Sequence, residues 1–286
     1  METIGRQKIW SFVDDARQIG PMTCTQIRTS RGYKVDSFID LARKVAELQF
    51  MNLGFVLLFR GQDADHRNAK HNTTLKPSLF RSKHKGNPSS EILIRRFQDL
   101  ENAERLLVDS FPQNESIAFE RLKRNQTIRW SILQHYKICP TPLLDVTQSL
   151  RIAASFASDK ADSEAFIFVL GVPNLSGAIS ASADAGLQII RLSSVCPPSA
   201  LRPHIQEGYL LGEYPEMAGY AQKELYHHYE IDFGRRLVAK FRFDPRTFWG
   251  LDAFPKVERG ALYPGSNLDP LYRMTLKIRK NLTLGD

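Results

Sequence analysis

The sequence contains little cysteine and no long apolar segment. Its three cysteines, Cys24, Cys139 and Cys196, are odd in number, lie far apart and form no Cys-x-x-Cys pair. A disulfide framework or a zinc site needs more cysteines at closer spacing. The sequence also lacks a run of about 18 apolar residues and an apolar segment of signal-peptide type near Met1. We therefore expect a cytoplasmic protein without disulfides and without a membrane partner.

Internal repeats, low-complexity tracts and metal-ligand spacings are also missing. The adjacent histidines His227 and His228 would point to opposite faces of a strand, and no acidic residue at a matching distance accompanies them. We expect no metal site. A chain of 286 residues with 42% apolar residues can bury a large core. We predict an N-terminal helical extension over residues 1–50 and one compact domain over residues 51–286.

Basic residues outnumber acidic ones by 39 to 31, which gives a formal net charge of +8 and a pI near 9.4. An excess of this sign favours polyanionic partners, nucleic acid among them. Many of the basic side chains fall in the polar segment between Asp63 and Ser90, namely Arg67, Lys70, His71, Lys76, Arg81, Lys83, His84 and Lys85. This segment is either a solvated loop or the rim of an anion-binding site.

Apolar periodicity predicts helices in the first half of the chain. A capping pattern at Ser37 opens a helix that has Phe38, Leu41 and Leu48 on one face. Further helices are predicted over residues 91–111 and 115–134. Basic side chains lie on these two helices at Arg95, Arg96, Arg121, Lys123, Arg124 and Arg129.

The second half has the pattern of strands. Residues 165–170 are continuously apolar, and residues 187–192 and 237–243 also have strand character. Within the last run, Lys240 and Arg242 alternate with apolar residues, which predicts one solvent-facing side. Strands that follow one another with few helices indicate an α+β fold, in which a helix-rich N-terminal half packs on a mainly antiparallel sheet.

An apolar run, Phe55-Val56-Leu57-Leu58-Phe59, leads directly into Arg60 and Gly61. A short apolar run bounded by polar residues is typical of a buried strand, so we expect Arg60 at the end of that strand. The guanidinium carries a planar set of donors suited to phosphate or carboxylate. Gly61 lets the backbone turn or approach a ligand closely. Arg60 therefore either binds an anionic ligand in a cleft or pairs with a structural acid.

A dense polar segment follows the predicted helix over residues 115–134. It contains His135 and Tyr136, and then two prolines that break the helix and force an extended segment. Alternation along that segment places Asp145, Thr147 and Ser149 on one side. Ser149 is also positioned to cap a helix whose alanines permit close packing beneath the site. Each hydroxyl is therefore either a ligand-binding group or a helix cap.

A third polar segment lies within Arg202–Leu211, where Gln206 and Glu207 precede Gly208 in an otherwise apolar stretch. We expect a strand here. A carboxylate within a strand is costly unless it has partners or a function, so Glu207 is either functional or at an exposed edge. Neighbours on a strand face opposite ways, so the pattern does not decide whether Gln206 or Glu207 faces the site.

Taken in order, these segments resemble the FRG domain family over residues 50–280. The motifs that carry the resemblance are Phe59-Arg60-Gly61-Gln62, Leu75-Lys76-Pro77-Ser78-Leu79-Phe80-Arg81, Leu133-Gln134-His135-Tyr136, the Pro140–Ser149 segment, the alanine-rich helix ending at Phe156-Ala157, Gln206-x-Gly208-Tyr209, Tyr263-Pro264-Gly265 and Leu268-Asp269. The sequence departs from the family pattern at Pro142, at Val146 and in Lys137-Ile138-Cys139.

The order of elements in this family looks like the ADP-ribosyltransferase fold, which has a split-sheet core and takes NAD as its substrate. The resemblance implies that Arg60, with Gly61 beside it, grips the pyrophosphate or a ribose of NAD. It implies that Thr147 and Ser149 hold the nicotinamide ribose and that Tyr136 stacks on the nicotinamide. It also places His135 and Asp145 in the NAD site.

The resemblance further implies a polar residue beside the reacting ribose. A carboxylate there would stabilise an oxocarbenium-like transition state or activate the acceptor, and Glu207 is the candidate. The family motif instead aligns Gln206, which can orient a ribose hydroxyl but cannot act as a base. Both residues therefore remain catalytic candidates together with Arg60.

The leading hypothesis is a mono-ADP-ribosyltransferase that modifies nucleic acid, with RNA favoured. The basic segment and the basic helices favour RNA or DNA over protein as the acceptor. By analogy with the family, such an enzyme would be a toxin of a toxin–antitoxin or phage-defence system, with an antitoxin protein as a possible partner. Two alternatives remain. One is a nucleic-acid-binding module that keeps the fold without catalysis, and the other is a metal-independent nuclease that uses His135, Asp145 and His204.

Overall fold

The computed structural model describes residues 4, 8–13, 19–82, 87–112, 116–216, 219–224, 231–250 and 254–282. The predictions that concern Lys83, His84 and Lys85 in the basic segment, and the His227–His228 pair, fall outside these residues. Within the described residues, no helix combines the length and the apolar character that a membrane crossing needs.

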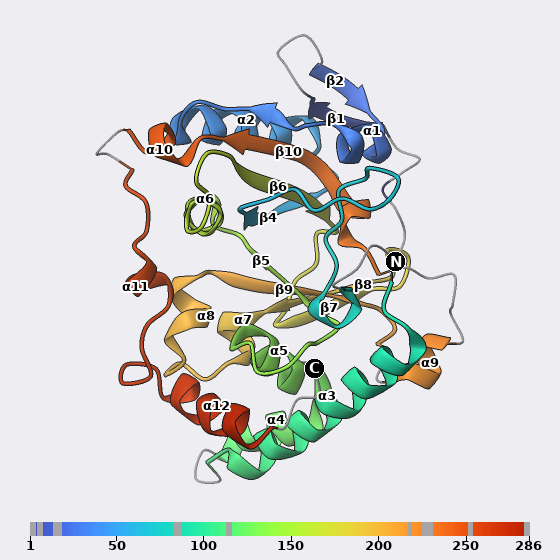
Figure 1. Ribbon diagram of the computed structural model, residues 1–286, viewed down its shortest axis with the longest axis vertical. Coiled ribbons are helices and arrows are strands. Elements are labelled where there is room, and N and C mark those ends of the chain that lie inside the picture. The colour runs from blue at the N-terminus through green and yellow to red at the C-terminus, as the bar shows by residue number, and fades with distance from the viewer. Residues whose placement is uncertain are drawn as a thin grey trace.

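The centre of the molecule is an eight-stranded sheet (Figure 1). Its strands lie in the order β3 (Tyr33–Lys34), β10 (Leu237–Phe243), β6 (Ala165–Val172), β4 (Val56–Gln62), β5 (Leu144–Thr147), β9 (Gly208–Glu213), β8 (Leu187–Arg191) and β7 (Ile179–Ser182). Every neighbouring pair is antiparallel except β3 and β10, which are parallel. The predicted α+β class with a mainly antiparallel sheet is confirmed.

The sheet divides between its fourth and fifth strands. β4 pairs with β6 over its whole length from Val56 to Gln62, and β5 pairs with β9 over its whole length from Leu144 to Thr147. Between β4 and β5, however, the pairing consists of Phe59 opposite Thr147. We call β3, β10, β6 and β4 the first half-sheet, and β5, β9, β8 and β7 the second half-sheet.

Two groups of described helices lie towards the two ends of the long axis, and α6 (Leu150–Ser158), α7 (Leu192–Val195), α8 (Leu201–Ile205) and α11 (Arg259–Leu262) lie between them (Figure 1). At one end, α1 (Cys24–Thr29) and α2 (Phe38–Met51) lie beside β10, together with a hairpin of β1 (Ile9–Phe12) and β2 (Ile19–Met22). At the other end, the second half-sheet is covered by α3 (Ser90–Ser110), α4 (Ser116–Arg124), α5 (Gln126–His135) and α12 (Pro270–Asn281). Residues 1–50, expected to be a helical extension, thus also contain the strands β1, β2 and β3.

The remaining elements are short. They are α9 (Tyr220–Glu224), α10 (Pro245–Phe248) and the 3-10 turns η2 (Ser78–Phe80) and η3 (Phe233–Arg236).

The helix predicted over residues 115–134 is two helices, α4 and α5. Asn125 between them is extended, with φ −119° and ψ 108°. The Arg129 guanidinium donates to the carbonyls of Leu122 and Lys123, both at 2.9 Å, which satisfies two of the acceptors left at the end of α4. A side chain one turn into the second helix therefore stabilises the break, and apolar spacing alone does not reveal this.

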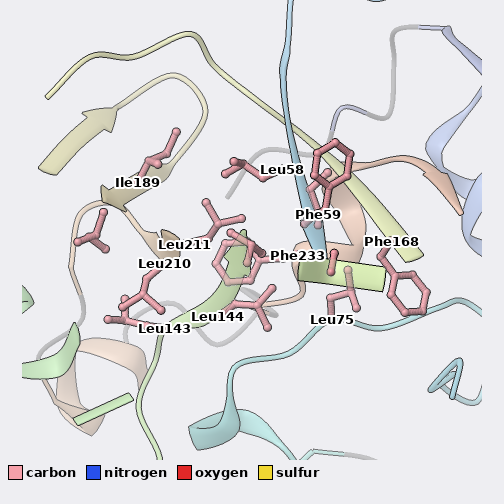
Figure 2. Close-up of a cluster of buried hydrophobic side chains, with 14 of the residues drawn as sticks. Leu58, Phe59, Leu75, Leu143, Leu144, Phe168, Ile189, Leu210, Leu211 and Phe233 are labelled. Carbon is pink, nitrogen blue, oxygen red and sulfur yellow. The ribbon is translucent and has the colours of Figure 1, made fainter. Parts of the chain in front are cut away.

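The hydrophobic core joins the two half-sheets (Figure 2). Side chains from β4, β5, β6, β8 and β9 meet there with residues of the connecting segments. The labelled members are Leu58, Phe59, Leu75, Leu143, Leu144, Phe168, Ile189, Leu210, Leu211 and Phe233. β6 is buried at every residue, as its continuously apolar sequence predicts.

The prediction that Lys240 faces solvent is wrong. β10 is an interior strand between β3 and β6, and the Lys240 side chain is fully buried. Its ammonium donates to the Ser30 carbonyl, to Thr73 Oγ1 at 2.9 Å and to Asp65 Oδ2 at 2.8 Å. A buried charge persists when it is paired and hydrogen-bonded in this way. The alternating pattern marks an internal ion pair here and not a wet face.

Gly61 allows α6 to pack directly against β4. A Cβ atom at position 61 would lie 1.8 Å from the carbonyl oxygen of Ala153, and Ala153, Ala154 and Ala157 are fully buried at the same contact. The small residues of α6 therefore permit close packing, as the sequence predicts. Gly61 serves this helix contact within the strand and does not form a turn after it.

Replacing Gly61 with alanine should lower the free energy of unfolding by about 1–3 kcal/mol, because the added methyl group forces α6 away from β4. Urea denaturation of the Gly61→Ala variant measures this effect. Gly54→Ala is the matched control, since a Cβ there meets nothing within 4 Å, and it should change stability by less than about 1 kcal/mol. Equal effects of the two substitutions would contradict the packing role.

Candidate functional site

A pocket of about 210 Å³ lies where the two half-sheets separate. It is lined by Phe59, Arg60, Gly61, His135, Lys137, Asp145, Val146, Thr147, Phe156, Gln206, Gly208 and Tyr263. A wider hollow of about 590 Å³ beside β1 and β2 has no ionisable side chain among its described lining residues. Most of the polar residues that the sequence predicts as site residues line the smaller pocket. We take this pocket as the candidate site.

Arg60 bridges the gap between the half-sheets. It lies inside β4, because Gly61 and Gln62 continue the pairing with β6, and so it is not at the strand's end as predicted. One guanidinium nitrogen donates to the backbone carbonyl of Asp145 at 2.5 Å, while Nε is buried without a hydrogen-bond partner among the described residues. The guanidinium of Arg60 thus donates to a backbone carbonyl and not to a carboxylate. Its Nε–H lies beside the pocket without a partner among the described residues.

The charge of Arg60 is destabilised by its surroundings. Burial, together with the positive charge of Arg81, lowers the pKa of the Arg60 guanidinium from 12.5 to about 10, and the nearby Asp145 opposes this shift. Burial likewise lowers the pKa of Arg81 and of Lys137 below their ordinary values, and Asp145 again opposes the shift. Among the described residues, Asp145 is the one carboxylate that lines the pocket, against the cations of Arg60 and Lys137. An anion in the pocket would offset this excess of positive charge.

His135 and Asp145 form a pair across the pocket wall. His135 is the last residue of α5, and its Nδ1 lies 3.4 Å from Asp145 Oδ1. Its Nε2 is buried and has no hydrogen-bond partner among the described residues. A carboxylate at one ring nitrogen orients the imidazole and leaves the other nitrogen to exchange a proton with a ligand.

Gln134 holds the Asp145 carboxylate in place. Gln134 Nε2 donates to Asp145 Oδ2 at 2.5 Å, and Gln134 Oε1 accepts from Thr141 Oγ1 at 2.5 Å and from Ser78 Oγ at 3.3 Å. The two hydroxyls fix which end of the amide faces Asp145. Burial raises the pKa of Asp145, but the hydrogen bonds from His135 and Gln134 and the charges of His135 and Arg60 outweigh burial and lower it below 3.8.

Thr147 and Gln206 connect the pocket to β9. Thr147 Oγ1 donates to the carbonyl of Gln206 at 2.8 Å, and the buried Gln206 side chain donates through Nε2 to the carbonyl of Leu262 at 2.7 Å. Both residues line the pocket. Gln206 thus links the second half-sheet to the C-terminal segment that supplies Tyr263.

Gln206 and Glu207 do not lie on a strand, so that structural prediction is wrong. Gln206 is the C-cap of α8, and Glu207 adopts a left-handed conformation with φ +45°, before β9 begins at Gly208. The backbone N–H of Glu207 donates to the carbonyl of His204, which ends the helix. The Glu207 side chain is exposed and is not part of the pocket lining, whereas Gln206 is.

Tyr136 and Ser149 also lie outside the pocket lining. Tyr136 is 2% exposed, its hydroxyl donates to Asp269 Oδ2 at 2.9 Å, and its ring stacks on Tyr272. Ser149 is the N-cap of α6 and accepts from the backbone of Ile152. The hydroxyl of Ser149 therefore caps a helix, which was one of its two predicted roles.

Tyr263, Lys137 and Gln134 were not predicted as site residues. Tyr263 supplies an aromatic wall, against which Phe156 packs with ring centroids 5.7 Å apart, and Lys137 Nζ lies 5.5 Å from the Tyr263 ring centre. The sequence does carry a signal for Tyr263 in its Tyr-Pro-Gly motif, and one for Gln134 in its Gln-His-Tyr motif. Lys137 has a φ of +55°, which brings its side chain to the pocket immediately after α5.

The set of residues expected for a nuclease is only partly assembled. His135 and Asp145 meet in the pocket, but His204 is exposed on α8 and does not line it. Among the described residues, no group of three or more His, Cys, Asp or Glu side chains is arranged to hold a metal ion.

Residues 56–165 match the family model of the FRG domain. The resemblance inferred from the sequence motifs is therefore confirmed over this part of the chain, which includes Arg60, His135, Asp145 and Thr147. The match ends where β6 begins, before Gln206 and Tyr263. No curated protein and no solved structure gave a match to this chain.

The lowered pKa of Asp145 predicts how acid affects stability. The native pKa lies below 3.8, so the hydrogen bonds of the carboxylate stabilise the fold fully above about pH 4, and this stabilisation is lost as the pH falls through the native pKa. The Asp145→Asn variant has no carboxylate at this position, so it lacks the part of the stability that depends on pH through this group. Its free energy of unfolding should therefore decline less than that of the wild type between about pH 5 and pH 2.

Urea unfolding followed by tryptophan fluorescence at stepped pH measures the two curves. Asp184→Asn is the control, since Asp184 is an exposed turn residue between β7 and β8 and its variant should follow the wild-type curve. Parallel curves for the wild type and Asp145→Asn would show that the carboxylate is not held as described.

Proposed function

We propose that this protein is a mono-ADP-ribosyltransferase that cleaves NAD and transfers ADP-ribose to a nucleic acid. The observation that carries the proposal is the convergence of Arg60, the His135–Asp145 pair and Gln206 on one pocket at the split in the sheet. These residues come from separate parts of the sequence. Such a convergence is typical of a site and not of a solvated surface.

The order of the elements supports the proposal. The ADP-ribosyltransferase fold is expected to have a split sheet with an arginine on a first strand, a hydroxyl on a later one and a polar residue at another. Here Arg60 lies on β4, Thr147 on β5 and Gln206 immediately before β9. The two half-sheets separate between β4 and β5. A transferase core of this kind is therefore part of the proposal.

The charge of the pocket suits an anionic ligand, and its small volume indicates that only part of such a ligand enters it. The unpartnered Nε of Arg60 and the ammonium of Lys137 are suited to phosphate or ribose oxygens. A volume of about 210 Å³ is smaller than the roughly 300–1,000 Å³ of pockets that enclose a whole ligand. We expect the pocket to take the nicotinamide riboside part, with the rest of NAD at the rim towards Arg81.

In the proposed reaction the bond between the nicotinamide nitrogen and ribose C1′ breaks, and its electron pair leaves with nicotinamide. The nucleophilic atom of the acceptor then bonds to C1′ and loses a proton. His135 Nε2 is free to take that proton while Asp145 stabilises the resulting imidazolium. Gln206 orients a ribose hydroxyl, and Tyr263, in place of the buried Tyr136, offers its ring to the nicotinamide.

The basic surface of the protein favours a nucleic acid as the acceptor over a protein. RNA is the first acceptor to test. By analogy with toxins of this chemistry, uncontrolled activity would harm the cell that makes the enzyme, so an antitoxin protein that covers the pocket is a partner to look for.

The test is incubation of the pure protein with NAD labelled in its adenylate part and separate pools of RNA, DNA and cell protein. We expect nicotinamide release and transfer of label to RNA. Arg60→Ala and His135→Ala should each lower the rate about 100-fold or more, since each removes a charge-stabilising or proton-accepting group.

Gln206→Ala and Glu207→Ala form a matched pair, because the two residues are adjacent and only Gln206 lines the pocket. We expect the first substitution to lower the rate and the second to leave it within about twofold. Absence of nicotinamide release and of label transfer under every condition would reject the proposal. Binding of RNA without release would indicate a non-catalytic module, and cleavage of RNA without NAD would indicate a nuclease.

A further inference from the structure

The helix α12 carries basic side chains and no acidic ones. Its sequence contains Arg273, Lys277, Arg279 and Lys280 and no aspartate or glutamate, and all four basic side chains are exposed. We call these four residues the basic strip. Within the described residues, Lys277, Arg279 and Lys280 have no ion-pair or hydrogen-bond partner through their side chains.

Three of the four residues of the strip lie on the side of α12 that faces away from the protein, and the fourth, Arg279, is exposed beside it. At about 100° per residue, Arg273, Lys277 and Lys280 share one face, and the buried residues Leu271 and Ile278 lie on the opposite face. Arg273 itself donates to the carbonyls of Ser266 and Asn267, so it is the least available of the four. The positive charge of Lys277, Arg279 and Lys280 is directed to solvent.

The covered apolar face of α12 argues against a membrane as the partner of the strip. A basic amphipathic helix binds a lipid surface by inserting its apolar face between the lipids. In α12 that face is already used, because the helix packs against α3 at the end of the molecule that lies beyond the second half-sheet (Figure 1). What remains accessible is a set of charges, which suits the phosphates of a nucleic acid backbone.

The first turn of α12 is fixed to the wall of the pocket. Asp269, its N-cap, accepts from the backbone of Tyr272 at 3.0 Å and from the Tyr136 hydroxyl at 2.9 Å. The Arg202 guanidinium lies 3.6 Å from the centre of the Tyr272 ring and 5.7 Å from that of Tyr263, which lines the pocket. A polymer held on α12 is therefore held at a constant position relative to the pocket.

We propose that the basic strip of α12 binds the sugar–phosphate backbone of the nucleic acid acceptor. The acceptor's identity rests on the proposed function, but the binding itself does not require NAD. Each phosphate contact releases a counterion, so the contribution of the strip depends on salt. Single-stranded chains fit best, because their bases remain free to reach the pocket.

The experiment compares two triple variants that lower the net charge equally. Lys277→Gln/Arg279→Gln/Lys280→Gln removes the free charges of the strip. Lys8→Gln/Lys34→Gln/Arg43→Gln removes three exposed charges, one just before β1, one in β3 and one in α2, at the other end of the molecule. Fluorescence anisotropy with labelled single-stranded RNA, single-stranded DNA and duplex DNA, without NAD, is recorded over a series of salt concentrations.

We expect the strip variant to bind single-stranded RNA about 100-fold more weakly at 0.1 M salt, with the slope of log affinity against log salt reduced by about 2. The control variant should stay close to the wild type. Lys277→Arg/Lys280→Arg keeps the charges and should keep the affinity. Comparison with this variant distinguishes the loss of phosphate contacts from a folding defect. Near-UV circular dichroism checks the folding of each variant independently.

Equal weakening in both triple variants, or no weakening in the strip variant, would overturn the proposal. Binding to anionic vesicles that is lost only in the strip variant would also overturn it, since the partner would then be lipid. Nicotinamide release from NAD without nucleic acid separates the two proposals. The strip variant should match the wild type in that release. Absence of release from the wild type under every condition, nucleic acid included, would reject the transferase while leaving the binding result valid.

Discussion

The structure depends on the contact that holds β4 and β5 together where their backbone ladder is open. One residue pair, Phe59 with Thr147, and the hydrogen bond from Arg60 to the carbonyl of Asp145 connect the strands at this point. The bond satisfies a backbone acceptor that the open ladder would otherwise leave without a partner. The same contact places a buried cation in the gap, and burial disfavours that charge. The gap is therefore a structural seam, and it also holds a buried cation beside the candidate pocket.

The polar groups around this seam hold one another in order. The hydroxyls of Ser78 and Thr141 orient Gln134, Gln134 orients Asp145, and Asp145 orients His135. Such a chain of hydrogen bonds restricts the orientation of each member, so the His135 ring is held at the pocket in one orientation. The order of the site thus comes from η2, α5, β5 and the residues that join them, and not from β4 alone.

Much of the fold was predictable because it depends on local pattern. The apolar runs of β4 and β6 and the helical spacing of α3 specify those elements without tertiary information. The ordered motifs brought Arg60, His135, Asp145, Thr147 and Gln206 together correctly as candidate neighbours. What failed depended on partners distant in sequence. Tyr136 turns away from the pocket because Asp269 receives its hydroxyl, and Lys240 is internal because Asp65 pairs with it. Glu207 is not part of β9, because its backbone N–H donates to the carbonyl of His204 at the end of α8.

The region that matches a known family, residues 56–165, contains only part of the eight-stranded sheet on which the pocket is built. Within it, β4 and β5 are joined by a single residue pair, while their extensive partners, β6 and β9, lie almost wholly beyond its limit. A fragment cut at these boundaries would present two strands with unsatisfied edges, which is a template for aggregation. It would also lack Gln206, Gly208 and Tyr263, which are three of the twelve described residues that line the pocket. Substitutions at Gln206 or Tyr263 would therefore change the pocket wall without altering any residue that the family model matches.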